Sequence, residues 1–301
     1  MKRSQIRKSV VNFIKNCNLY HLLRKMRNMI NYEFSVRCNG RKLKGLKIYS
    51  GRTTPSEPWM LQLIEVALRE KKASFVDVGA NVGQTLLAVK SIDPDCVYYG
   101  FEPNPACHTL LEELVRINSF KNCFCLPVGL YASDEIKVLS LYEDNITNPG
   151  GSIVDDYWAF NNIKPVRQIF VPVMKFQSAT KSIPVNKIGV IKIDVEGAEL
   201  EVLHCLRDRI VEDSPWIIIE ILSAYSKENK LRVDRQAKIE AFLAEIAYQA
   251  FQIVTTEHGE LGFVEPIMRF DPASDKDLCN YLFVPSSDVK SVQASKVGVR
   301  R

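Results

Sequence analysis

The sequence predicts an α/β protein built on a doubly wound, mostly parallel sheet, and two observations support this fold class. First, short apolar runs typical of strands alternate with segments of helical periodicity through most of the 301 residues. Second, the runs Ile188–Val195 and Pro215–Ile221 are apolar with little alternation, as expected of strands covered on both faces. Near the C-terminus, Gln252–Thr256 and Tyr281–Val284 can form the final strands, and we expect an antiparallel edge there.

The first 58 residues form an extension that differs in charge from the rest of the chain. Residues 1–52 hold 14 Lys/Arg and one acidic residue, whereas the remaining 249 residues hold 26 basic and 34 acidic residues. Apolar residues at helical spacing between residues 4 and 30 predict a basic amphipathic helix. Such a helix can lie on an anionic membrane, pack on the domain as a lid, or simply be solvated. The alternating residues 34–49 around Asn39-Gly40 predict a hairpin.

Periodicity and capping residues predict one domain over residues 59–285, followed by a frayed, disordered tail over residues 286–301. Helices are expected over Trp59–Arg69, after Gly83, over Pro105–Asn118, from Gly197 to Leu206 and over Val233–Phe251. Further strands are expected over Phe75–Val78, Val97–Phe101, Cys123–Leu130, Ile136–Tyr142 and Ile169–Val173. Residues 143–168 are polar and rich in Gly, Pro and Asn, which predicts a functional or disordered loop. Its aromatic residues Tyr157, Trp158 and Phe160 can cover a sugar ring.

Cysteine usage and hydropathy indicate a cytoplasmic protein. The N-terminus lacks a convincing signal peptide, and no stretch approaches the roughly 20 apolar residues of a membrane span. The eight cysteines form no CxxC pair, so we expect reduced thiols and no zinc site. Binding of the basic N-terminus to lipid would place the protein peripherally at the inner face of the membrane.

A glycine turn between two strands predicts a binding site for a nucleoside-containing cofactor. Gly79-x-Asn81-x-Gly83 follows a strand and opens a helix, but it lacks the glycine order of dinucleotide and ATP-phosphate sites. Asp77 can counter an ammonium group, and the helix N-terminus can hold a carboxylate. Glu102, at the end of the next strand, suits a ribose diol. A ligand with these groups is an amino acid joined to a nucleoside, which describes S-adenosylmethionine.

A second group of acidic residues marks the ends of two buried strands. Asp194 and Glu196 end one strand and Glu220 ends the next, at the sheet edge where ligands bind in open α/β folds. Buried acids cost several kcal/mol each unless they are paired, which favours a functional role for Asp194. For Glu199 we favour a charge that complements the helix dipole. His204 lies on the following helix, two turns past the end of the strand, and is interpreted as a packing histidine.

Five segments together resemble FkbM-type S-adenosylmethionine-dependent methyltransferases. They lie in order within residues 74–221, about half of the chain, and the ordered set is more specific than any one segment. The segments are FVDVGANVGQT at Phe75–Thr85, EPNP at Glu102–Pro105, VGLYASD at Val128–Asp134, IKIDVEGAELEVL at Ile191–Leu203 and PWIIIE at Pro215–Glu220.

The resemblance implies a seven-stranded class I, Rossmann-like sheet and O-methylation of hydroxyl groups on sugars or secondary metabolites. The acceptor is then a small molecule or a hydroxyl of a glycan or glycolipid. By position, Asn104 and the Gly129-Leu130 stretch lie near the adenine. The remaining cofactor-binding residues implied by position are Asp77, Gly79, Asn81, Gly83 and Glu102.

Methyl transfer to an alcohol needs a group that removes the hydroxyl proton. We expect Asp194 or Glu196 to take that proton, or to hold a divalent metal ion that assists, with Glu220 as a further candidate. A nucleic-acid methyltransferase is an alternative, but the chain lacks a [DN]PP[YF] motif and a visible RNA-binding module. A catalytically inactive protein that keeps only the fold is a third possibility. The oligomeric state is left open.

Overall fold

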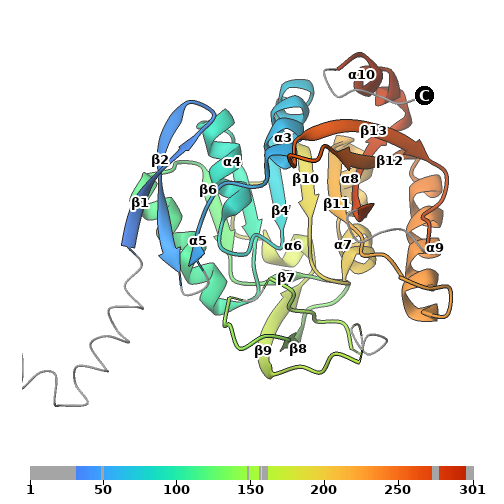
Figure 1. Cartoon of the computed structure of the whole chain (residues 1–301), viewed down its shortest axis with the longest axis horizontal. Coiled ribbons are helices and arrows are strands. Elements are labelled where there is room, and N and C mark those ends of the chain that lie inside the picture. The colour runs from blue at the N-terminus through green and yellow to red at the C-terminus, as the bar shows by residue number, and fades with distance from the viewer. Residues whose placement is uncertain are drawn as a thin grey trace, which may run out of the picture.

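The computed structural model describes residues 32–48, 51–147, 149–155, 157, 162–272 and 278–295. These residues form an eight-stranded central sheet with helices on both faces, a small three-stranded sheet below it, and an N-terminal hairpin at one end (Figure 1). The basic helix expected within residues 4–30 lies outside the described residues and stays a prediction.

The central sheet has the predicted mostly parallel arrangement. The five strands from β11 to β6 run parallel, whereas β14 runs antiparallel to β11 and β12, and β13 antiparallel to β12. The sheet has one strand more than the seven implied by the resemblance, because an unpredicted edge strand, β13, follows the turn at residues 256–260. In spatial order the strands are β13 (Leu261–Ile267), β12 (Tyr248–Thr255), β14 (Asn280–Pro285), β11 (Trp216–Glu220), β10 (Ile188–Ile193), β4 (Ser74–Val78), β5 (Tyr98–Phe101) and β6 (Cys123–Leu126).

Helices cover both faces of this sheet, as expected of a doubly wound fold. Successive strand residues point to opposite faces, so Phe75 belongs to one core and Val76 to the other, and both are fully buried. The Phe75 face is covered by α3 (Pro58–Glu70), α4 (Gln84–Ile92), α5 (Pro105–Asn118) and α10 (Val289–Ala294). The Val76 face is covered by α6 (Phe176–Ala179), α7 (Glu199–Cys205), α8 (Arg207–Asp213) and α9 (Lys230–Glu245).

The N-terminal hairpin forms as predicted and packs on the domain. Strands β1 (Tyr32–Cys38) and β2 (Arg41–Ile48) pair antiparallel around the Asn39-Gly40 turn. Leu46 is fully buried in the core beneath α3, α4 and α5, and Asn118 at the end of α5 exchanges two hydrogen bonds with the Lys44 backbone. The short strand β3 (Gly51–Arg52) then leads toward α3.

Two expected elements end earlier than the sequence suggested. The helix expected over Val233–Phe251 ends at Glu245, because Ala247 adopts a positive φ of 55° that stops the helix, and β12 begins at Tyr248. The strand expected over Cys123–Leu130 breaks after Leu126, since Pro127 has no N–H with which to continue the ladder.

After this break, the chain enters a small three-stranded sheet. It is ordered β7-β9-β8, with β7 (Gly129–Leu130) parallel and β8 (Glu135–Leu141) antiparallel to β9 (Arg167–Met174). Its inner face forms a third core with Ile153 and Ala198. It therefore places part of the predicted 143–168 loop beside the ends of the central strands.

The expected disordered tail is wrong for residues 286–294. A 3₁₀ turn over Ser286–Asp288 and helix α10 follow β14 directly, and Val292 is fully buried. The Asp288 carboxylate accepts a hydrogen bond from Trp216 Nε1 at 3.0 Å and pairs with Lys71 Nζ at 2.5 Å. These contacts fix the segment against the core. Residues 296–301 lie outside the described part of the chain.

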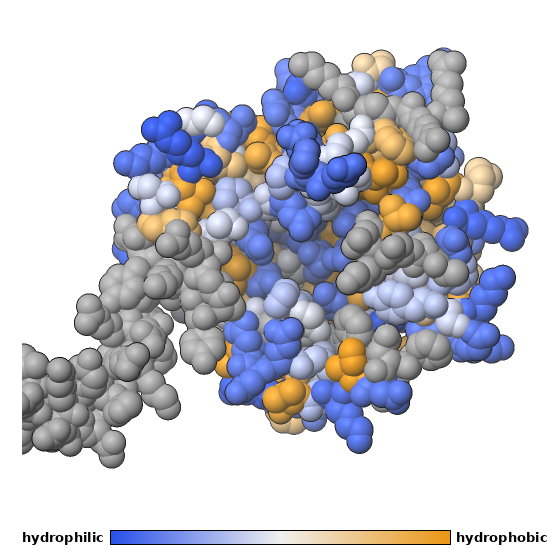
Figure 2. Space-filling model, viewed as in Figure 1, coloured by the Kyte–Doolittle hydropathy of each residue, from blue (hydrophilic) through white to orange (hydrophobic). Residues whose placement is uncertain are grey.

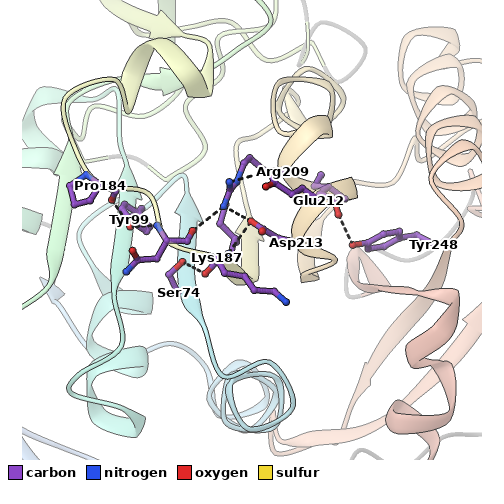
Figure 3. A network of polar contacts seen from close by, with 11 residues as sticks. Ser74, Tyr99, Pro184, Lys187, Arg209, Glu212, Asp213 and Tyr248 are labelled. Atoms are coloured by element: carbon purple, nitrogen blue, oxygen red, sulfur yellow. Dashed lines mark hydrogen bonds and ion pairs between the residues drawn. The ribbon is translucent and has the colours of Figure 1, made fainter.

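A polar network at the amino ends of the strands fixes the chain where it enters β10 (Figure 3). Asp213 accepts hydrogen bonds from the Ile188 amide at 3.0 Å and pairs with Arg209 at 2.5 Å. The Tyr99 hydroxyl donates to the Pro184 carbonyl at 2.7 Å, and Ser74 Oγ donates to the Lys187 carbonyl at 2.7 Å. This network is structural, because it lies at the end of the strands opposite to the acidic residues.

Candidate active site

A cavity of about 780 Å³ opens at the carboxyl ends of the parallel strands. The chain order runs outward from β4 through β5 and β6 on one side and from β10 through β11 on the other, so the switch point lies between β4 and β10. Ligands of open α/β sheets bind at such a point. The cavity is also bounded by the start of α3, the β12–β13 turn and the loop at residues 149–153. Figure 2 shows the hollow near the middle of this face, with mostly hydrophilic surface around it.

The glycine turn after β4 forms one wall of this cavity. Gly79 has a φ of +82°, and a Cβ at this position would lie 1.8 Å from the Asp194 carbonyl oxygen, so only glycine fits. Gly83, with a φ of +88°, caps α4 and packs against Leu114, but it does not line the cavity. The turn therefore brings β4 and β10 together at the point where the site forms.

Glu102 lies at the end of β5, as expected for a residue that binds a ribose. Its Oε2 accepts from the Asn81 amide and its Oε1 from the Asn104 amide, both at 2.8 Å. Burial raises the pKa of Glu102 to about 7, although the two amide donors oppose this shift. Each carboxylate oxygen keeps a second lone pair, so Glu102 can still accept from hydroxyl groups in the cavity.

Asn81, Asn104 and Gly129 also lie in the cavity wall. Asn81 Oδ1 is buried without a hydrogen-bond partner, which leaves one acceptor available to a ligand. Asn104 is occupied, because its Oδ1 caps α5 at the Ala106 amide and its Nδ2 donates to the Ile146 carbonyl. All three therefore line the cavity, and the side chain of Asn104 has a structural role there.

Asp77 does not lie where its predicted role requires. It is fully buried and does not line the cavity, so direct contact with a ligand's ammonium group does not fit this geometry. The Tyr98 hydroxyl donates to Asp77 Oδ2 at 2.5 Å, and Lys192 Nζ lies 3.5 Å from Oδ1. Burial raises the pKa of Asp77, and the charge of Lys192 opposes this shift. Asp77 therefore acts on the cavity through Lys192.

Lys192 lines the cavity, although it was not among the site residues predicted from the sequence. Its ammonium lies in the cavity floor, 3.1 Å from Asp194 Oδ2, and it donates to the Gly79 carbonyl at 3.4 Å. Burial disfavours its charged form, but Asp194 and Asp77 together raise the pKa of Lys192, so it remains an ammonium. The available signal was a single charged residue inside the apolar strand Ile188–Ile193.

The three predicted catalytic acids meet in this floor. Asp194, Glu196 and Glu220 each bring one carboxylate oxygen within 4.8 Å of the others. Burial and the charges of Asp194 and Glu220 raise the pKa of Glu196 to about 9, and burial and Asp194 raise that of Glu220 to about 7. Glu196 has a positive φ of 52°, and its Oε2 is buried without a hydrogen-bond partner.

This acidic group is a poor match for a divalent metal ion. Asp194 is already paired with the Lys192 ammonium, and Glu220 Oε1 accepts from the Cys279 thiol at 3.0 Å. A metal ion would have to displace Lys192 or bind beside its positive charge. We therefore derive no step that requires a metal.

Three residues noted in the sequence lie outside the reacting region. Glu199 begins α7 and accepts from the Gly197 amide at 2.8 Å, as expected for a helix-terminal charge. His204 packs edge-on against Phe242 on an exposed helix face. Tyr157 is buried against Gly197 and Arg232, so it is not an open platform for a sugar. Trp158 and Phe160 lie outside the described residues.

The fold and the site together define an α/β protein of the class I, Rossmann-like methyltransferase type. The model of the methyltransferase FkbM domain matches residues 77–253, more than half of the sequence, and the chain therefore belongs to the FkbM methyltransferase family.

The chain is also similar to curated proteins and to solved structures. The chain is 24% identical over 157 residues to "Methyltransferase 1" of Beauveria bassiana and 25% identical over 172 residues to "Methyltransferase sdnD" of Sordaria araneosa. Each match covers 48% of this chain, and the chain spans 61% and 62% of the respective relatives. A solved FkbM methyltransferase from Methylobacillus flagellatus aligns with a TM-score of 0.43 and 16% identity, over 70% of this chain and 43% of that one. An O-methyltransferase from Bacillus cereus in complex with SAH aligns with a TM-score of 0.43 and 8% identity, over 77% of this chain and 83% of that one.

The residues around the cavity fit S-adenosylmethionine. Glu102 can accept from ribose hydroxyls, and the unpartnered Asn81 Oδ1 can accept from an N–H group. The side chains of Leu130, Leu139 and Ile153 offer an apolar wall for a base. The cavity volume lies within the usual range of small-molecule sites, about 300–1,000 Å³.

Proposed function

We propose that this protein transfers a methyl group from S-adenosylmethionine to a hydroxyl group of a sugar, in a glycan, a glycolipid or a secondary metabolite. One observation supports this proposal above the others: three carboxyl groups share a cavity with the glycine turn and Glu102. A cofactor wall and a set of proton-accepting groups therefore face the same space. When bound, the cofactor supplies an activated methyl group on a positively charged sulfur.

Asp194 is the residue to which we assign removal of the acceptor proton. It ends β10 beside the glycine turn and lines the cavity, and the Lys192 ammonium at 3.1 Å balances its charge. Lys192 is itself not a base, because its raised pKa keeps it protonated. Glu196 carries a proton at neutral pH, because its pKa is raised to about 9. It can therefore donate a hydrogen bond that holds the acceptor.

The acceptor has room on the side of the cavity that faces away from Glu102. That side is formed by the start of α3, with Glu57 and Trp59, and by Thr255, Gly259 and Asn280 at the ends of β12 and β14. The Gly259 carbonyl accepts from the Trp59 amide at 3.0 Å, so the two segments are joined over the opening. Hydroxyl-bearing acceptors can find both donors and acceptors among these groups.

The charge of the cavity argues against a nucleic-acid acceptor. Among the described lining residues, Lys192 is the one basic side chain, and its ammonium is already bound to Asp77 and Asp194. Nucleic-acid sites need several Lys or Arg side chains to bind phosphates. The described basic residues between 32 and 52 do not line the cavity.

The proposed function is tested by a labelled-methyl transfer assay. The protein is incubated with methyl-labelled S-adenosylmethionine and, in parallel reactions, with an extract of glycans and glycolipids, with nucleic acid or with protein, and labelled products are identified by mass spectrometry. We expect a mass increase of one methyl group on a sugar oxygen. Label that enters only nucleic acid or protein would contradict the assignment of the acceptor.

A further inference from the structure

We propose that the acidic floor of the cavity, formed by Asp194, Glu196 and Glu220, selects the charged methyl donor over its demethylated product. The donor S-adenosylmethionine carries a positive sulfur, whereas the product S-adenosylhomocysteine carries a neutral thioether. The proposal rests on the proposed function and adds a specificity to the same site. It assigns to these carboxylates a role in ligand discrimination beyond proton transfer.

Acidic side chains outnumber basic ones around the cavity. The described lining residues include one basic side chain, that of Lys192, against five carboxylic acids. Lys192 is shared between Asp194 and the fully buried Asp77, so this one positive charge is outnumbered by the acids of the lining. The five acids in the lining are Glu57, Glu102, Asp194, Glu196 and Glu220.

The nearest other cations do not correct this imbalance. Arg235 is bound to Glu201, and Arg232 lies over the Tyr157 ring and donates to the Ser223 carbonyl. Neither arginine lines the cavity. Among the described residues, Glu220 therefore faces the cavity without an ion-pair partner, and Glu196 is protonated at neutral pH because its pKa is raised to about 9.

The carboxyl groups of the cavity floor lie close enough to repel one another. The three carboxyl groups approach within 4.8 Å, and burial together with this mutual repulsion raises the pKa of Glu196 to about 9 and that of Glu220 to about 7. At pH 7.5 Glu196 is therefore protonated, whereas the carboxylates of Asp194 and Glu220 attract a nearby positive charge and not a neutral atom. The free energy gained by binding the cation is therefore unavailable to the neutral product.

The acidic floor lies directly against the glycine turn that follows β4. The Asp194 carbonyl lies against Gly79, so closely that a Cβ on Gly79 would approach it to 1.8 Å, and Lys192 donates to the Gly79 carbonyl. The acids and the glycine turn are thus parts of one wall. Asn81 Oδ1, buried at the same turn without a hydrogen-bond partner, offers an acceptor to a ligand in this wall.

Such selectivity would reduce inhibition by the product. Methyl transfer removes the positive charge from the sulfur, so the interaction that favours the donor disappears as the product forms. The product then leaves a site that no longer attracts it, and the next donor molecule competes successfully for the cavity.

The test is calorimetric titration of the whole chain with the two ligands separately at pH 7.5 and low ionic strength. We expect the dissociation constant of S-adenosylmethionine to be at least tenfold lower than that of S-adenosylhomocysteine, a difference of about 1.4 kcal/mol. In Glu220→Gln, which keeps the shape and removes one charge, this ratio should fall at least threefold. In Glu112→Gln, whose side chain is 53% exposed on α5 outside the cavity, the ratio should stay unchanged.

The outcomes separate this inference from the proposed function. If the wild type binds both ligands equally, or the product more tightly, the charge selection is wrong while the cofactor site stands. If neither ligand binds, the proposed function itself is contradicted. Glu196→Gln is a second variant: it replaces a carboxyl group that is protonated at pH 7.5, so its ratio should stay close to that of the wild type. Thermal unfolding confirms the fold of both variants, and an unchanged ratio in folded Glu220→Gln would also overturn the inference.

Discussion

At the scale of single residues, Asp77, Lys192 and Asp194 form a chain of charges that runs from the sheet core into the cavity. Tyr98 donates to Asp77, Asp77 pairs with Lys192, and Lys192 pairs with Asp194. Removing the Lys192 charge would leave the fully buried Asp77 without its cationic partner, which costs about 3–5 kcal/mol. The cavity floor therefore depends on Asp77, which does not line the cavity.

Gly79 is a position where one added methyl group should abolish the site. Gly79→Ala forces a Cβ to 1.8 Å from the Asp194 carbonyl in a residue with a φ of +82°, so we expect a loss of more than about 3 kcal/mol in the free energy of unfolding. Gly40→Ala is the matched control, since its φ of +73° carries the same backbone strain with nothing within 4 Å. Urea unfolding of both variants measures the difference, and equal losses would contradict the packing argument.

Glu196 should destabilise the ligand-free protein as the pH rises. Its pKa is raised to about 9 in the folded state, so between its ordinary value and pH 9 the unfolded chain ionises first and the free energy of unfolding falls. Glu196→Gln removes this effect. We expect the variant to match the wild type at pH 4 and to be more stable by at least about 1 kcal/mol at pH 8.

Urea unfolding at the two pH values measures this change without a cofactor. The exposed Glu112→Gln variant is the control and should differ from the wild type by less than about 0.5 kcal/mol at both pH values. A difference for Glu196→Gln that does not grow with pH would show that its carboxyl is not held protonated.

At the scale of elements, the sequence was most informative where strong local signals agree with packing. The Asn39-Gly40 hairpin, the Asn104 cap of α5 and the parallel strands around Asp77 formed as predicted. Boundaries failed where tertiary pairing competed with periodicity. The apolar residues Tyr248 and Phe251 fit a helix by spacing, yet they pair with β14 in the sheet.

Helix α10 was not predicted from the sequence. The segment after Pro285 is polar and was interpreted as a frayed tail, because its stabilising partners lie far away in the sequence. Lys71 and Trp216 both bind Asp288, at distances of 2.5 and 3.0 Å, and neither contact can be read from local composition.

Loss of this anchor should be measurable. We expect Asp288→Ala to lower the free energy of unfolding by about 1–3 kcal/mol, since two donors lose a shared acceptor. Asp208→Ala removes a carboxylate whose side chain is 77% exposed and should change stability by less than about 0.5 kcal/mol. Thermal or urea unfolding measures both, and equal effects would indicate that α10 is not anchored through Asp288.

At the scale of the whole molecule, the chain combines an acidic cavity with a basic N-terminal segment. Every helix in the described part of the structure is too short or too polar to cross a bilayer. We propose that residues 1–31 contact anionic lipid, since residues 1–52 hold 14 basic residues and one acid.

Vesicle sedimentation tests this contact. We expect the full chain to sediment with vesicles that contain phosphatidylserine at low salt and to be released as salt rises, because the attraction is electrostatic. A chain that begins at Tyr32, where β1 starts, should stay in solution, as should the full chain mixed with neutral vesicles. Sedimentation that is unaffected by removing residues 1–31 would assign the contact elsewhere.

The individual residues of the candidate site were easier to predict from the sequence than the contacts between them. Glu102 and the three acids line one cavity, as the sequence predicted, because each ends or follows a strand at the same edge of the sheet. Lys192 was not predicted, nor was the burial of Asp77 behind it, because both depend on one ion pair between neighbouring strands. Pairing between β4 and β10, which are separated by more than one hundred residues, carries no local sequence signal.

The central claim is that Asp194 accepts the proton in a methyl transfer supported by this cavity. The most direct measurement compares turnover and S-adenosylmethionine affinity in the wild type, Asp194→Asn and Glu196→Gln. We expect Asp194→Asn to lose about 10²- to 10⁴-fold in turnover while binding the cofactor, as removal of a general base does. Turnover close to the wild type in both variants would contradict the account.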